Sequence, residues 1–173
     1  EIPDLNGIKF TSNNFMEMIE CIRFDGGRFD ILNGFDEMLL CGMAVGARGG
    51  VGSTYNYSLR TYQNIYDAFM AGDLEQARAA QQESVDIVHV IINHGGGIRG
   101  GKASMKLVGI DCGDCRLPLA PYTEAEIARL DEELRAIGFK KQPAYRADNQ
   151  HARLSGRFRS GGRSFRPVRN GIK

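Results

Sequence analysis

The chain has few cysteines, a small net charge and no long apolar run. Each of these features excludes some classes of protein. Four cysteines in 173 residues do not make the dense framework of a disulfide-stapled secreted domain, so we expect reduced thiols and a cytoplasmic location. No apolar run reaches the length of a transmembrane helix, and no basic-then-apolar leader opens the sequence. We therefore expect no membrane partner. The first residue is Glu1 rather than methionine, which predicts a start inside a longer reading frame.

Charge is unevenly distributed, although the formal net charge is only +1. Residues 146–173 contain eight Arg or Lys and one Asp, a balance of +7, so the preceding part carries about −6. This basic tail is rich in Gly, Ser and Asn without apolar periodicity, and we expect it to be disordered. A basic arm can bind nucleic acid or a membrane surface. A tail without any binding partner can have the same composition. We therefore assign the tail no function and expect no nucleic-acid partner.

Strand patterns alternate with helix patterns in the first third of the chain. Strands are predicted over 7–11, 29–33 and 49–53, and helices over 14–24 and 36–45. Strands that alternate with helices are typical of a parallel α/β architecture.

From Tyr55 onward the pattern is helical. Helices are predicted around 59–69, over 74–92 and over 102–108, with a last one that a capping box begins at Thr123. Leu130, Leu134 and Ile137 form its predicted buried stripe. We therefore divide the chain into β/α units over 1–72, a helical appendage over 73–145 and the basic tail.

Lys9 lies near the C-terminal end of the first predicted strand. In barrels of alternating strands and helices, that end carries the reacting groups. Desolvation of an inward-facing lysine favours its neutral amine, which is a nucleophile. The alternative is a solvated lysine at a strand end, because most lysines lie in water. These residues alone leave both interpretations open.

Cys112 and Cys115 have the spacing of half a zinc site, but no second close pair completes four ligands. We therefore expect no metal, and we interpret His89 as a packing or surface histidine. A phosphate loop follows a strand, but no strand is predicted before the glycines at 95–97 and 100–101. We therefore expect these glycines to connect two helices.

Three motifs end the predicted strands: Gly7-Ile8-Lys9-Phe10-Thr11, Asn33-Gly34-Phe35-Asp36-Glu37 and Gly52-Ser53-Thr54-Tyr55-Asn56. Together they resemble the N-acetylneuraminate lyase family of pyruvate-dependent class I aldolases, which are dihydrodipicolinate synthase-like. The resemblance covers about residues 1–140 and includes Arg116-Leu117-Pro118-Leu119. The lysine-x-threonine pair is common to these aldolases, whereas the other two motifs point to the sialic acid branch.

The resemblance implies a role for each matching residue. Lys9 corresponds to the lysine that forms a Schiff base with pyruvate, and Thr11 to a threonine that contacts the sugar part of the substrate. The positions that hold the polyhydroxyl chain of sialic acid correspond to Gly34, Asp36, Glu37 and Ser53. An iminium is an electron sink for carbon–carbon cleavage, and carboxylates and hydroxyls recognise sugar hydroxyls. The implied reaction is reversible cleavage of N-acetylneuraminate to N-acetylmannosamine and pyruvate, with no cofactor.

The implied fold is α/β: about the last three β/α units of a (β/α)8 TIM barrel, plus a C-terminal helical appendage. The family's carboxylate-binding loop and proton-relay tyrosine lie on earlier strands, and Tyr55 stands in a different motif. Small-molecule substrates and a homo-oligomer, tetrameric in this family, are the implied partners. Two alternatives stay open. One is a related synthase with a smaller aldehyde partner, which would not need the Asp36–Glu37 pair, and the other is a truncated non-catalytic chain that acts as an interaction module.

Overall fold

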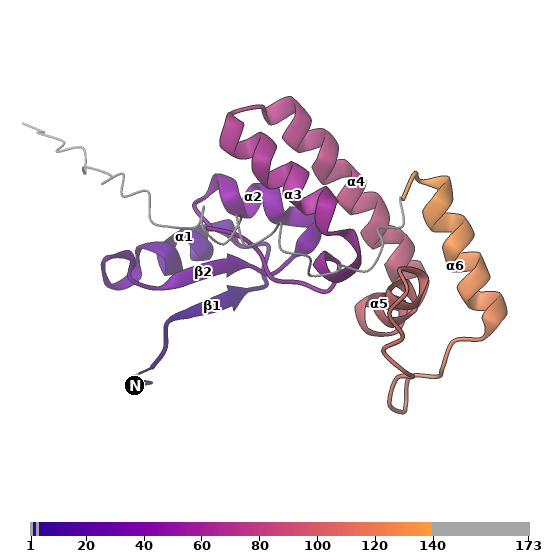
Figure 1. Ribbon diagram of the computed structural model, residues 1–173. Coiled ribbons are helices and arrows are strands. Elements are labelled where there is room, and N and C mark those ends of the chain that lie inside the picture. The colour runs from indigo at the N-terminus through magenta and orange to yellow at the C-terminus, as the bar shows by residue number, and fades with distance from the viewer. Residues whose placement is uncertain (1, 3, 140–173) are drawn as a thin grey trace, which may run out of the picture.

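Two parallel strands joined by a helix open the fold, in a computed structural model that describes residue 2 and residues 4–139. Strand β1 (Gly7–Phe10) pairs with β2 (Asp30–Asn33), and helix α1 (Phe15–Arg23) connects them (Figure 1). The sequence prediction of this first β/α unit is confirmed. The domain division and the basic tail stay predictions, and the tail lies outside the described residues.

Helix α1 begins where the sequence predicts it. The side chain of Asn14, the N-cap residue, accepts a hydrogen bond from the Glu17 N–H at 3.3 Å. Met18 is fully buried on the inner face of the helix and forms a small apolar cluster with Ile31 and Ala47. This cluster holds α1 against β2.

The third predicted strand, over 49–53, is reduced to a single parallel bridge between Asn33 and Gly50. The Asn33 N–H donates to the Gly49 carbonyl, and the Asn33 carbonyl accepts from Val51, both at 2.9 Å. The prediction of a full strand is wrong. A run of glycines offers almost no side chains for cross-strand packing, so the ladder extends no further.

A short helical segment follows β2, as predicted for 36–45. It starts as a 3₁₀ helix, η2 (Asp36–Met38), and continues as α2 (Leu39–Ala44). Another 3₁₀ segment, η1 (Phe24–Gly27), ends α1 in a turn with left-handed glycines.

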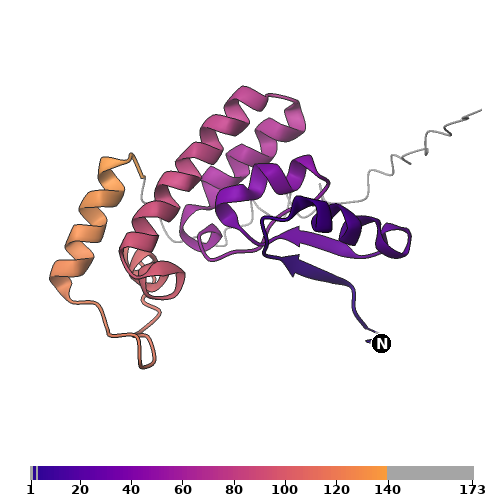
Figure 2. The ribbon, with the colours of Figure 1, turned by 180° about the vertical axis from the view of Figure 1, so that it is seen from behind.

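Helices α3 (Tyr55–Ala71) and α4 (Leu74–Asn93) form an antiparallel hairpin beside the strands (Figures 1 and 2). Asp73 begins α4 as predicted, because its side chain accepts a hydrogen bond from the Gln76 N–H at 2.9 Å. Leu39, Tyr62 and other apolar residues pack α2 against this hairpin. The predicted domain boundary falls in the turn between α3 and α4.

Helix α5 (Gly96–Leu107) is longer than the predicted helix over 102–108. The interpretation of the glycines as a connection is wrong for those from Gly96 onward, since they lie inside α5. A Cβ atom at Gly100 would lie 2.9 Å from the Ile91 carbonyl oxygen on α4. Glycine is unfavourable within a helix, but here it permits close packing of α5 on α4.

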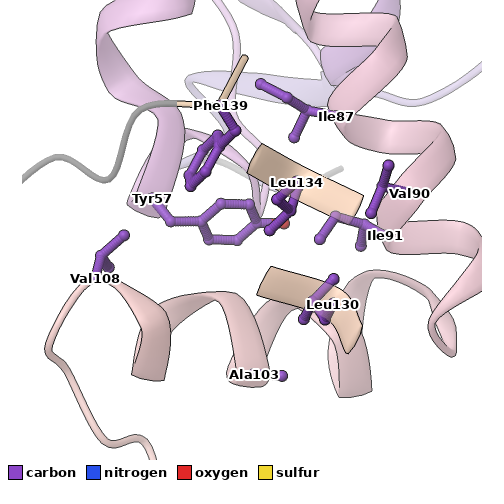
Figure 3. Close-up of a cluster of buried hydrophobic side chains, with 9 residues drawn as sticks. All are labelled: Tyr57, Ile87, Val90, Ile91, Ala103, Val108, Leu130, Leu134 and Phe139. Atoms are coloured by element: carbon purple, nitrogen blue, oxygen red, sulfur yellow. The ribbon is translucent and has the colours of Figure 1, made fainter. Parts of the chain in front are cut away.

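Helix α6 (Glu124–Ala136) begins with the predicted capping box, in which Thr123 and Glu126 exchange hydrogen bonds. Leu130 and Leu134 are fully buried as predicted, but Ile137 is 36% exposed. Gly138 adopts a left-handed conformation and turns the chain, so Phe139 is buried instead. Figure 3 shows Phe139 beside Tyr57 in the apolar cluster that α3, α4, α5 and α6 share.

Within the described residues, no helix has the length and apolar character that would let it span a bilayer.

Candidate active site

Lys9 and Thr11 lie at the C-terminal end of β1. Lys9 pairs with Leu32 of β2 in the strand register, and Thr11 directly follows the strand. Both side chains are exposed. Among the described residues nothing covers the Lys9 amine, so the desolvation expected from the sequence is not supplied by this part of the chain.

Gly34 brings the ends of the two strands into contact. Its N–H donates to the Phe10 carbonyl at 2.8 Å. A Cβ atom at this position would lie 2.0 Å from Thr11 Oγ1 and 2.8 Å from the Phe10 carbonyl oxygen. Only glycine therefore fits here without moving backbone, and its absence of a side chain sets Thr11 against the end of β2.

Asp36 is buried, with 6% of its surface exposed. Its Oδ2 accepts hydrogen bonds from the Thr54 N–H, at 3.0 Å, and from the Thr54 hydroxyl. Its Oδ1 is buried without a hydrogen-bond partner among the described residues and faces Gly52, where a Cβ atom would lie 1.5 Å away. The carboxylate therefore holds the segment after Gly50 and leaves one buried acceptor oxygen without a donor among the described residues.

Glu37 and Ser53 complete the predicted set. Glu37 is half-buried and makes no hydrogen bond or ion pair with another described residue. Ser53 is exposed, and its carbonyl accepts from the Asn56 side chain at 2.9 Å. The structure thus places Thr11 against Gly34, and Asp36 directly before Glu37 and beside the segment that carries Ser53.

Thr54 is a further residue of the candidate site, and sequence reasoning missed it. It is 3% exposed and donates to Asp36 from both its N–H and its hydroxyl. It belongs to the Gly-Ser-Thr-Tyr-Asn motif, so the motif contained the signal. A pairing across 18 residues between two polar side chains has no periodicity that would have predicted it.

Three tyrosines interact with the charge of Asp36, and of these Tyr57 and Tyr62 are buried and Tyr55 is partly buried. Burial raises the pKa of Tyr55 and of Tyr57, and the charge on Asp36 raises each further. Burial also raises the pKa of Tyr62 to about 12, although hydrogen bonds with Ser84 and Thr54 oppose this shift. All three phenols therefore stay protonated at neutral pH and act as neutral groups beside the carboxylate.

Two cavities lie at the helical end of the molecule, away from these residues. One, of about 270 Å³, is lined by Arg99, Lys102, Tyr122 and their neighbours, and the other, of about 360 Å³, by His94, Glu133 and their neighbours. None of the predicted site residues lines either cavity.

The Cys112–Cys115 segment is held by a lysine. Lys102 Nζ donates to the carbonyl oxygens of Cys112, Gly113 and Asp114 at 3.1, 3.3 and 2.8 Å. His94 pairs with Glu133, with 3.0 Å between Nε2 and Oε2. In the described part of the chain, no three His, Cys, Asp or Glu side chains gather as metal ligands.

Comparison with known proteins relates this geometry to one family. The sequence model of the dihydrodipicolinate synthetase family matches residues 1–137. N-acetylneuraminate lyase from Mus musculus is 35% identical over 146 residues, which cover 83% of this chain and 46% of the mouse protein. The lyase from Gallus gallus is 37% identical over 139 residues, covering 79% and 45%.

Solved structures agree with this relationship. The N-acetylneuraminate lyase of Proteus mirabilis superposes with a TM-score of 0.75 at 37% identity, covering 80% of this chain and 47% of that one. The Aliivibrio salmonicida lyase gives a TM-score of 0.75 at 38% identity, covering 81% and 46%. The chain spans slightly less than half the length of these relatives, and its fold matches part of their barrel, as the sequence predicted.

Proposed function

Because the chain belongs to the dihydrodipicolinate synthetase family, we propose that the protein that carries it is an N-acetylneuraminate lyase. The proposed reaction is reversible cleavage of N-acetylneuraminate to N-acetylmannosamine and pyruvate. Lyases of that name reach 39% identity to this chain, whereas a dihydrodipicolinate synthase structure is 21% identical. This difference favours the lyase over the synthase with a smaller aldehyde partner.

The observation that carries the proposal is the acidic pair directly after β2. Glu37 makes no hydrogen bond or ion pair with another described residue, and Asp36 Oδ1 is a buried acceptor without a donor. A buried unpaired acceptor costs free energy unless a ligand supplies the donor. The hydroxyls of a polyhydroxyl chain are suitable donors, and a small aldehyde offers few of them.

Lys9 is the proposed nucleophile. Its amine forms a Schiff base with the keto group of pyruvate or of the open-chain sugar acid, releasing water. The iminium then accepts the electron pair of the C3–C4 bond while the C4 hydroxyl gives its proton to a base, so N-acetylmannosamine leaves as the aldehyde. The pyruvate carbons stay on Lys9 as an enamine, which is protonated at C3 and hydrolysed to release pyruvate and the free amine. Thr11, which lies against Gly34, is the residue that we propose contacts the sugar part.

The test is reductive trapping. The complete protein, incubated with pyruvate and borohydride, should gain one pyruvate-derived mass at Lys9 and should cleave N-acetylneuraminate in preference to condensing aspartate semialdehyde. Lys9→Ala should abolish both labelling and turnover. Lys106→Ala is the matched control, because Lys106 is exposed and lies on α5. Labelling elsewhere with full activity would contradict the role of Lys9.

A non-catalytic interaction module is the competing function, and a complete protein that shows neither trapping nor turnover would favour it. The homo-oligomeric state and the cytoplasmic location belong to the same proposal. Sedimentation of the purified protein and cell fractionation test them.

A further inference from the structure

Four buried polar side chains form a hydrogen-bonded ring that begins and ends on Asp36. The Asp36 Oδ2 accepts from the Thr54 hydroxyl, and the Thr54 hydroxyl lies 2.5 Å from the Tyr62 hydroxyl. Ser84 Oγ lies 3.1 Å from the Tyr62 hydroxyl and 3.4 Å from the Asp36 carbonyl oxygen. The ring therefore joins η2, the start of α3 and the middle of α4.

The donors in this ring have one consistent direction. A carboxylate only accepts, so the single hydroxyl proton of Thr54 goes to Asp36. Thr54 must then accept from Tyr62, which stays protonated because burial raises its pKa to about 12. The Tyr62 oxygen in turn accepts from Ser84, whose single proton is shared with the Asp36 carbonyl oxygen. The protons of Thr54 and Tyr62 thus point toward the carboxylate, and the Tyr62 hydroxyl, by donating to the Thr54 oxygen, strengthens and orients the hydrogen bond from Thr54 to Asp36.

Water cannot easily replace a member of the ring. Asp36, Thr54, Tyr62 and Ser84 are 6%, 3%, 2% and 0% exposed. Removal of one hydroxyl would leave its neighbour unpaired in a buried place, which costs more than the hydrogen bond itself contributes. The ring consequently fixes the rotamer of Asp36.

From this geometry we infer that Tyr62 and Ser84 are positioning residues for the sugar part of the substrate, acting on Asp36 through Thr54. With Oδ2 held by Thr54, Oδ1 is fixed beside Gly52 as the oxygen that can accept from a substrate hydroxyl. The inference rests on the proposed lyase function. It assigns two residues of helices α3 and α4 to substrate specificity, although neither is expected to touch the substrate.

The test compares Tyr62→Phe, which removes one hydroxyl, with wild type in the complete protein. We expect kcat/KM for N-acetylneuraminate to fall about 3- to 10-fold, mainly through a higher KM, because one hydrogen bond that holds a ligand group is lost. Borohydride trapping of pyruvate at Lys9 should be unchanged, since pyruvate has no hydroxyl tail. Ser84→Ala should act in the same direction, with Ser104→Ala as the matched control. Ser104 is also a fully buried helical serine, but its hydroxyl donates only to the Gly100 carbonyl.

A double-mutant cycle separates positioning from a general loss of structure. Without the carboxylate there is nothing to position, so Asp36→Ala combined with Tyr62→Phe should be no less active than Asp36→Ala alone. Thr54→Ser keeps the hydroxyl and should retain activity, whereas Thr54→Val should resemble Tyr62→Phe. Multiplied losses in the cycle, or an equal loss of pyruvate trapping, would overturn the inference.

Failure of the inference and failure of the proposed function give different results. If wild type cleaves N-acetylneuraminate and Tyr62→Phe does so equally well, the positioning role is wrong and the lyase stands. If wild type does not cleave it, the proposed function is wrong, and the positioning role falls with it. Amide hydrogen exchange at Thr54 then reports on the ring alone: Tyr62→Phe should speed it about 10-fold, and Tyr55→Phe, whose hydroxyl has no hydrogen-bond partner among the described residues, should not.

Discussion

The strand-end region, residues 7–54, buries a carboxylate and an amide besides its apolar residues, whereas the helical region, residues 74–139, buries mainly apolar side chains. The strand-end region buries Asn33, Asp36 and Thr54, each less than 10% exposed, and their hydrogen bonds join β2 to the segment after Gly49. The helical region buries leucines, isoleucines and valines in one cluster (Figure 3). Burial of apolar groups is favourable on its own, whereas each buried polar group needs a partner.

The two regions also differ in where their charged and polar groups lie, and this difference predicts different effects of substitutions. In the helical region, Arg99 near the start of α5 contacts Glu126, and His94 at the end of α4 contacts Glu133. In the strand-end region the polar groups lie inside, and one carboxylate oxygen has no donor among the described residues. We therefore expect changes in the apolar cluster of the helical region to alter stability alone. Changes in the strand-end region, and at Ser84 of α4, which contacts it, should alter substrate use as well.

The largest expected effect is in the helical region. Leu134 is fully buried, so Leu134→Ala removes apolar contacts and leaves a cavity, which should lower the free energy of unfolding by about 2–5 kcal/mol. Urea unfolding followed by circular dichroism measures it. Leu117→Ala is the matched control, because Leu117 is 86% exposed and its loss should change stability by less than about 0.5 kcal/mol.

Leu134→Ala separates the two regions only if the variant keeps the proposed Schiff-base reaction at Lys9. Below the unfolding transition, Leu134→Ala should be labelled by pyruvate and borohydride at Lys9 as fast as wild type. Slower labelling of the folded variant would show that the two regions are not separable.

The next largest effect is at Gly52. In Gly52→Ala the new methyl group would lie 1.5 Å from Asp36 Oδ1 and 2.4 Å from Oδ2, so the carboxylate must leave Thr54. We expect a loss of about 1–3 kcal/mol in stability and a loss of N-acetylneuraminate turnover with pyruvate trapping retained. Gly49→Ala is the matched control in the same segment, since nothing lies within 4 Å of its added methyl group. Equal effects of the two variants would contradict the tight contact at Gly52.

Local signals were sufficient to predict much of this fold. Asn14, Asp73 and Thr123 each cap a helix through a side chain and an N–H three residues away, so the information lies within one turn. The alternation of the first two strands with helices was equally local. The family motifs placed Lys9, Gly34 and Asp36 at strand ends.

The errors have a common cause in contacts between distant residues. Helix α5 tolerates Gly100 because this residue packs closely on the Ile91 carbonyl of α4. Helix propensity takes no account of such contacts between helices, so it did not predict this glycine inside a helix. The strand over 49–53 shortened to one bridge for lack of side chains to pair, and Phe139 replaced Ile137 once Gly138 turned the chain. The partner of Asp36 was missed because Thr54 meets it only in the folded chain.

The smallest expected effect concerns pH and the helical region alone. The Thr123 N–H, the Arg99 guanidinium and the Thr123 hydroxyl hold the Glu126 carboxylate and lower its pKa to about 2. Because the folded pKa is below the unfolded value of about 4.3, this group stabilises the fold above pH 4.3 and loses that contribution as pH falls toward 2.

In Glu126→Gln the difference in unfolding free energy from wild type should therefore be constant from pH 5 to pH 7 and should shrink between pH 4.3 and 2. Glu124→Gln, which removes the same charge from the same helical turn, is the control for net charge. A difference that stayed constant down to pH 2 would show that the carboxylate does not hold the start of α6, and pyruvate labelling at Lys9 at neutral pH should be the same in all three proteins.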